Sequence, residues 1–91
     1  MSVTVRVPAQ LRTLTGGAAE VPLEGSTVGE VLKALEVTHA GFADRLFDDT
    51  GGLRRFVNVF LDDEDVRFLQ GLSTPVDEGQ TLSIIPAVAG G

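Results

Sequence analysis

The residues most suited to a chemical reaction are the last two, Gly90 and Gly91, which end in a carboxylate that no side chain shields. Because glycine has no Cβ, such a terminus can adopt backbone angles closed to other residues and can enter a channel too narrow for side chains. Pro86 should end the preceding apolar run, since proline has no N–H for a sheet ladder. The tail therefore suits insertion into another protein's active site, although a frayed terminus that happens to end in glycine would look the same.

Few other residues offer chemistry of their own. The sequence has no cysteine and one histidine, His39, which excludes a disulfide framework, a thiolate metal site and a cysteine nucleophile. His39 lacks an evident orienting partner, so we interpret it as a surface or capping residue. The acidic run 62–65 does not match the alternating oxygen ligands of a calcium loop and is interpreted as a solvated hairpin tip. We therefore expect the chain itself to bind no metal and no cofactor.

Length and charge narrow the function classes further. Ninety-one residues make one domain, which we expect to span residues 1–86, with residues 87–91 as a flexible tail. A net charge of −6 repels phosphate backbones, so nucleic-acid binding is not expected. The sequence shows no signal-peptide pattern and no apolar run of membrane-spanning length. We expect no membrane partner and a cytoplasmic location.

Apolar periodicity predicts the elements that must position the tail. Residues 2–7 alternate polar and apolar side chains, and residues 18–23 form a second expected strand with Val21 and Leu23 on one face. The short connection between them is centred on glycine, which predicts an antiparallel hairpin. Thr27 and Glu30 form a capping-box pattern at the start of a helix that should end between Thr38 and Gly41, with Gly41 as a left-handed cap. A short second helix is expected around residues 43–47.

Three further strands are expected at residues 56–61, near residues 66–68 and at residues 82–85. This order of elements predicts an α+β domain with a helix on one face of a mixed sheet and an open second face. Phe56, Phe60 and Ile85 are candidates for the open face, where an apolar cluster indicates a contact surface. For Phe60 a second interpretation stays open, because large aromatic side chains are usually mostly buried and it would then lie under a loop.

Over its whole length the chain resembles the ubiquitin-like β-grasp sulfur carriers of the MoaD/ThiS type. The resemblance rests on the strand 56–61 leading into residues 62–66, on the turn 77–80 and on the ending 84–91. The CysO-type branch is the most similar, because segments 55–58, 62–68 and 86–91 resemble it in residues as well as in spacing. The resemblance implies a β-grasp fold, with a mixed sheet of about five strands, one main helix on one face and a short second helix.

The resemblance also implies a function. In such carriers a ubiquitin-activating-type adenylating enzyme uses ATP and magnesium to adenylate the terminal carboxylate, here that of Gly91 after Gly90, and sulfur then displaces AMP. The resulting thiocarboxylate would donate sulfur to a sulfur-accepting synthase in cysteine, cofactor or secondary-metabolite biosynthesis. The chain would thus be a protein co-substrate and not an enzyme. The residues expected to bind partners are Phe56, Phe60, Ile85, Pro86, Val88 and Ala89.

Three rival functions stay open on the sequence. A ubiquitin-like protein modifier would use the same activation but would join Gly91 to lysines of target proteins, and the chain itself has one lysine, Lys33. The small subunit of a sulfur-transfer synthase would stay bound to its larger partner. A binding module with an inert tail would work without Gly90 and Gly91.

Overall fold

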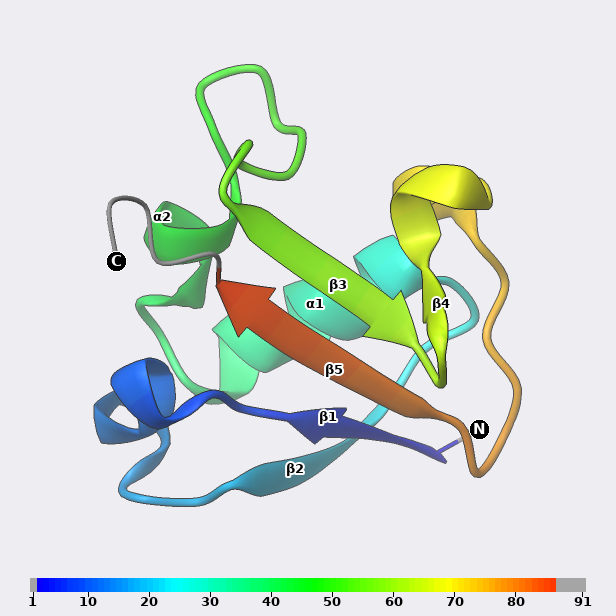
Figure 1. Ribbon diagram of the computed structural model, residues 1–91. Helices are drawn as coiled ribbons and strands as arrows, with labels where there is room; N and C mark the ends of the chain where they lie inside the picture. Colours follow the sequence, from blue (N-terminus) through cyan, green and yellow to red (C-terminus); the bar gives the residue numbers. More distant parts are fainter. Residues whose placement is uncertain (1, 87–91) are drawn as a thin grey trace.

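The computed structural model describes residues 2–86, which form a five-stranded sheet with helices packed against one face (Figure 1). The strand order is β2-β1-β5-β3-β4. Strand β1 pairs with β5 in parallel and the other pairs are antiparallel, so the sheet is mixed, as the sequence predicts. The strands are β1 (Ser2–Arg6), β2 (Glu20–Glu24), β3 (Val57–Leu61), β4 (Glu64–Asp65) and β5 (Thr81–Pro86).

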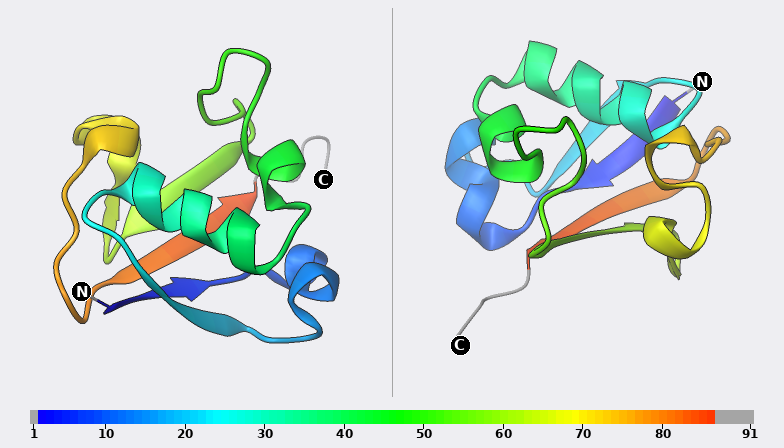
Figure 2. Two further views of the ribbon diagram at one scale, coloured as in Figure 1. Left: turned by 180° about the vertical axis from the view of Figure 1, so that it is seen from behind. Right: turned by 90° about the horizontal axis from the view of Figure 1, so that it is seen from above.

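Two α-helices cover one side of the sheet, and its other side stays open (Figure 2). The main helix α1 (Val28–Thr38) crosses the sheet, and the short α2 (Phe42–Leu46) follows it. Three short 3-10 helices occupy the connections: η1 (Ala9–Thr15), η2 (Val66–Phe68) and η3 (Gly71–Ser73). The predicted α+β architecture, with one main helix and a short second one, is confirmed.

The start of α1 is fixed by the predicted capping box. The Glu30 N–H donates to the Thr27 hydroxyl at 3.2 Å, and the Glu30 carboxylate accepts from the Ser26 N–H at 2.9 Å. The returning bond therefore reaches one residue further back than the usual box, to an N–H that precedes the N-cap. This anchoring directs the apolar stripe of α1 into the core, where its buried members are Val28, Val31, Leu32 and Leu35.

The end of α1 lies within the predicted range, but the predicted Gly41 cap is wrong. The helix ends at Thr38, and the C-cap His39 donates its N–H to the Leu35 carbonyl at 2.8 Å. Gly41 does adopt a positive φ of 112°, but it is the N-cap of α2 and does not end α1. The Glu36 carboxylate accepts from the N–H groups of Gly41 and Ala43, at 3.1 and 2.7 Å, and so joins the two helices.

The core lies between the sheet and the two α-helices. Alternate residues of each long strand point inward, as predicted, and all are at most 8% exposed. Phe42 and Leu46 of α2, both fully buried, close one end of this layer. The inward strand residues are Val3, Val5, Val21, Leu23, Val57, Val59, Leu61, Leu82 and Ile84.

Two segments differ from the expected elements. Residues 9–15, interpreted from the sequence as a connection with Leu11 and Leu14 at the core edge, form the 3-10 helix η1, in which Leu11 is buried and Leu14 packs against the core. A strand was expected near residues 66–68, but the strand is Glu64–Asp65 and residues 66–68 form η2. The chain turns there because the Asp65 carboxylate accepts from the Arg67 N–H at 2.9 Å, a local bond that competes with strand pairing.

Candidate functional site

The candidate site is built on β5, the central strand of the sheet. Its last residue, Pro86, lies opposite Val57 in the register with β3, and Ile85 lies opposite Asn58. The sheet therefore fixes the position of Pro86, the last described residue. The predicted site residues Val88, Ala89, Gly90 and Gly91 lie outside the described residues.

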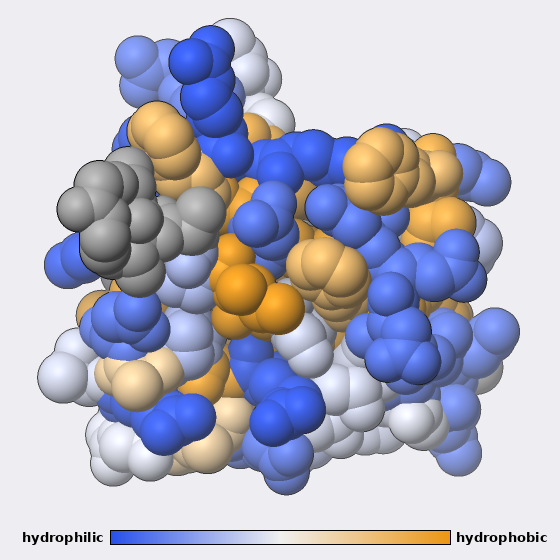
Figure 3. Space-filling model, in the orientation of Figure 1, coloured by the Kyte–Doolittle hydropathy of each residue, from blue (hydrophilic) through white to orange (hydrophobic). Residues whose placement is uncertain are grey.

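The open face of the sheet carries two of the predicted contact residues. Ile85 lies opposite Asn58, and Phe60 lies opposite Ser83, so both point away from the helices. Ile85 is 47% exposed. Phe60 is half-buried, so its side chain is neither fully exposed on the open face nor fully buried under a loop. Figure 3 shows hydrophobic residues gathered over the middle of this face, bordered by hydrophilic ones.

Phe56 occupies a different place from the one predicted. It precedes β3 and is 55% exposed. It shares a surface hollow with Pro86 at the end of the sheet, and so lies next to the point where the tail leaves. The predicted partner-binding residues thus fall into two groups, one on the open face and one at the base of the tail.

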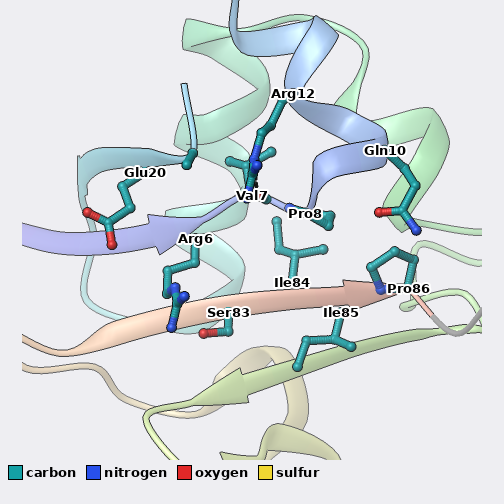
Figure 4. A pocket seen from close by; sticks show the side chains of 11 residues that line it. Arg6, Val7, Pro8, Gln10, Arg12, Glu20, Ser83, Ile84, Ile85 and Pro86 are labelled. Atoms are coloured by element: carbon teal, nitrogen blue, oxygen red, sulfur yellow. Dashed lines mark hydrogen bonds between the residues drawn. The ribbon is translucent and has the colours of Figure 1, made fainter. Parts of the chain in front are cut away.

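Two hollows flank Pro86. The first, the β1 hollow, has a volume of about 420 Å³ and lies between β1, η1 and the end of β5 (Figure 4). The second, the β3 hollow, has a volume of about 410 Å³ and lies between the start of β3 and the region of α2. Polar residues of the β1 hollow are Arg6, Gln10, Arg12, Glu20 and Ser83. Those of the β3 hollow are Arg45, Asp48, Arg54 and Arg55.

Sequence analysis missed this concentration of arginines. Arg54 and Arg55 are adjacent in the sequence, but the other three come from β1, η1 and α2. No spacing in the sequence relates them. The sheet order could have indicated that Arg6 lies near Arg54 and Arg55, because β1 ends and β3 begins at the edge where β5 ends. It does not place Arg12 or Arg45, which lie in η1 and α2.

Asp48 is the carboxylate of the β3 hollow, and its pKa lies below the usual 3.8. The main cause is a hydrogen bond from the Thr50 hydroxyl, and the Thr50 N–H and the positive charge of Arg54 act in the same direction. Asp48 is therefore ionised at neutral pH and partly offsets the arginines around it.

The part of the chain that the structure describes supports neither a metal site nor a membrane-spanning helix. Between residues 2 and 86, no three His, Cys, Asp or Glu side chains come together as metal ligands. Within the same range, no helix combines the length and the apolar character needed to cross a membrane.

A mixed sheet crossed by one main helix, with a central strand that leads to the chain end, defines the ubiquitin-like β-grasp class. The chain belongs to the ThiS family, whose family model matches residues 5–91. It is 47% identical over 93 residues to the sulfur carrier protein CysO of Mycobacterium tuberculosis, with all of both chains covered. It is 41% identical over 68 residues to small archaeal modifier protein 3 of Haloferax volcanii, covering 75% of this chain and 73% of the relative.

Solved structures of CysO and of a small archaeal modifier protein are also similar to this chain. CysO in the crystal structure of the Amycolatopsis orientalis BexX/CysO complex superposes with a TM-score of 0.92 at 50% identity, covering 98% of this chain and 99% of the other. The crystal structure of the modifier SAMP1 from Haloferax volcanii has a TM-score of 0.85 at 29% identity, with full coverage of both. The chain is thus a small carrier protein of the sulfur-carrier type and not an enzyme. Carriers of the CysO type act with partner proteins.

Proposed function

We propose that the Gly91 carboxylate is adenylated by a ubiquitin-activating-type enzyme and then converted to a thiocarboxylate that donates sulfur in biosynthesis. The observation that carries this proposal is the run of the central strand into the tail. Because Pro86 is held opposite Val57, residues 87–91 start from a fixed point at the edge of the sheet. An extended chain of five residues spans at most about 17 Å, which is enough to carry a carboxylate into a partner's active site.

The chemistry needs an activated acyl group. A carboxylate oxygen of Gly91 attacks the α-phosphorus of ATP, pyrophosphate leaves, and an acyl-adenylate results. A sulfur nucleophile then attacks the carbonyl carbon, and AMP leaves with the bonding electron pair. In this scheme the partner supplies ATP, magnesium and positioning, while the chain supplies the reacting carboxylate. The thiocarboxylate sulfur later attacks an electrophile held by a sulfur-accepting synthase.

Thiocarboxylate formation can be tested by intact-mass spectrometry after incubation with such an enzyme from the same cell, ATP, magnesium and sulfide. We expect a mass gain equal to the replacement of one oxygen by sulfur, mapped to Gly91. Gly91→Ala, or one residue added after Gly91, should abolish this gain. Gly52→Ala is the matched control, because its new Cβ would meet only the Thr50 hydroxyl oxygen, at an ordinary 3.6 Å.

Either of two results would contradict the proposal. Undiminished thiocarboxylate on Gly91→Ala would remove the terminal glycine from the mechanism. No mass change on the wild-type chain with an enzyme that adenylates another carrier would favour a binding module with an inert tail.

We also propose that Phe60 and Ile85 dock the activating enzyme through the open face, with Phe56 and Pro86 at the base of the tail and Val88 and Ala89 inside its channel. Support comes from the exposure of Ile85 and from the shared orientation of Phe60 and Ile85. Partly exposed aromatic and large aliphatic residues often carry most of the binding energy of an interface.

Alanine substitutions test this docking role. Ile85→Ala and Phe60→Ala should each weaken binding of the activating enzyme by about tenfold, which corresponds to roughly 1.4 kcal/mol. Val37→Ala is the matched control, because Val37 is 82% exposed on α1, away from the open face. If Phe60→Ala lowers the unfolding temperature but leaves the affinity unchanged, Phe60 is a structural residue.

Sequence similarity to a protein modifier supports a second candidate function, the conjugation of Gly91 to lysines of target proteins. Its support is the 41% identity to small archaeal modifier protein 3. Tagged chain expressed in its own cells, followed by mass spectrometry of denatured extract, should then show isopeptides ending in Gly91. Their absence under conditions in which the thiocarboxylate accumulates would leave sulfur transfer as the function.

A further inference from the structure

The surface around Pro86 is basic in an otherwise acidic molecule. Five arginines line the two hollows beside this residue, against two carboxylates, Glu20 and Asp48, which gives a net charge of +3. The rest of the chain holds the remaining two of 7 basic and 11 of 13 acidic side chains, a net charge of −9. We call this set the arginine collar: Arg6, Arg12, Arg45, Arg54 and Arg55.

Most of the collar's charge is not neutralised within the described chain. Between residues 2 and 86, the guanidinium groups of Arg6, Arg45 and Arg55 make no hydrogen bond or ion pair. Arg12 and Arg54 each use only Nε, which donates to the Val7 carbonyl at 3.0 Å and to the Asp44 carbonyl at 3.1 Å. These bonds hold the two side chains against the backbone and leave the outer N–H groups of each guanidinium free to bind an anion.

The anion could be a nucleotide phosphate or a set of carboxylates, and the length of the tail favours the carboxylates. An extended tail of residues 87–91 places its terminal carboxylate up to about 17 Å beyond Pro86. The nucleotide must lie at that carboxylate during adenylation, so with an extended tail it would lie up to about 17 Å from Pro86. The mouth of a channel that receives an extended tail would, in contrast, face the collar.

We infer that the arginine collar docks on a carboxylate-rich rim around the tail channel of the activating enzyme. This inference rests on the proposed function and adds the chemistry of the partner surface. Arginine forks bind carboxylates through paired hydrogen bonds. An acidic rim attracts the collar and repels the remaining surface, so it selects the orientation in which the tail points into the channel.

The test measures association with the activating enzyme in the absence of ATP, by stopped-flow at low and high ionic strength. Arg55→Glu and Arg6→Glu each alter one hollow at a side chain that makes no internal bond. Each should lower the association rate about tenfold at low salt, and the difference from wild type should shrink to less than twofold at about 0.5 M salt. Lys33→Glu is the matched control, since it makes the same charge change on α1, and it should stay within about twofold of wild type.

Three results would overturn the inference. Equal losses in Lys33→Glu and the collar variants would mean that net charge alone matters. Undiminished association of the collar variants would mean that the rim is not acidic. A loss that appears only when ATP is present would identify the nucleotide phosphate as the anion. Thiocarboxylate formation at saturating enzyme is measured in parallel. If the wild-type chain forms none, the proposed function fails. If all variants form it, the association rates alone decide whether the collar binds the rim.

Discussion

Asp62 organises the turn between β3 and β4 with a single side chain. Its backbone has a positive φ of 55°, a conformation that side-chain-bearing residues rarely adopt. Its two carboxylate oxygens accept from the Thr81 N–H and from the Gln80 side chain, both at 3.0 Å. These bonds connect the turn to the start of β5, so the acidic run has a structural role at its first residue.

Asp62→Ala should therefore lower the free energy of unfolding by about 1–2 kcal/mol, because two hydrogen bonds are lost while the unusual backbone conformation remains. Asp63→Ala is the control and should change it by less than about 0.5 kcal/mol, since Asp63 is exposed and accepts no hydrogen bond within residues 2–86. Urea denaturation measures both. Equal effects of the two substitutions would contradict this role of Asp62.

The lowered pKa of Asp48 gives a prediction that depends on pH. Because its folded-state pKa lies below the usual 3.8, ionised Asp48 favours the folded state above that value, and this contribution is lost as pH falls through the folded pKa. Thr50→Val removes the hydroxyl that causes most of the shift and should move the Asp48 pKa back towards 3.8. A carboxyl-carbon NMR titration measures the pKa in both chains. An unchanged pKa would show that the Thr50 hydroxyl does not cause the shift.

At the scale of elements, Glu36 joins α1 to α2. Its carboxylate satisfies two N–H groups at the start of α2, a helix of five residues that has no side-chain cap of its own. Glu36→Ala should lower the free energy of unfolding by about 1–3 kcal/mol, because those N–H groups lose a charged acceptor.

Hydrogen exchange can locate the effect of Glu36→Ala. The amides of residues 42–47 should exchange faster than in wild type, while those of β1 and β5 keep their relative protection. Glu36→Gln retains a side-chain acceptor and should show an intermediate effect. Uniform faster exchange throughout the chain would mean that the substitution acts on the whole fold and not on α2.

The four long strands and α1 could be predicted from the sequence because their apolar residues repeat with a period of two or of 3.6. The strand β4, with two acidic residues, carries no such repeat. The 3-10 helices could not, because a turn of three to seven residues leaves no periodic pattern and depends on local bonds such as that from Arg67 to Asp65. Gly41 was expected to end α1, but its positive φ serves the start of α2. A glycine between two short helices allows either use, and Glu36 selects the second.

The candidate site was predictable only in part. The outward residues of β3 and β5 follow from the sequence, since alternation alone places Phe60 and Ile85 on one face. The role of Gly90 and Gly91 stays a prediction. The arginine collar does not, because its members come from four separate segments that only the folded sheet brings to the same edge. Charge counted over the whole chain hides this cluster beneath a net value of −6.

At the scale of the whole molecule, the fold should not depend on the residues that we propose to react. Within residues 2–86, the core residues lie between Val3 and Ile84. A chain truncated after Pro86 should therefore unfold with a free energy within about 0.5 kcal/mol of that of the full chain, and it should form no thiocarboxylate. Parallel urea denaturation and intact-mass measurements test both halves. A clear loss of stability would place residues 87–91 in the folded domain and contradict the boundary after Pro86.

The parallel pairing of β1 with β5 has a mechanical consequence. One strand starts near the beginning of the chain and the other runs towards its end, so tension applied to the two ends would pull these neighbouring strands past one another. The hydrogen bonds between them would then be loaded together in shear, so they could not break one after another. A partner that grips the tail and pulls should release it before the sheet yields.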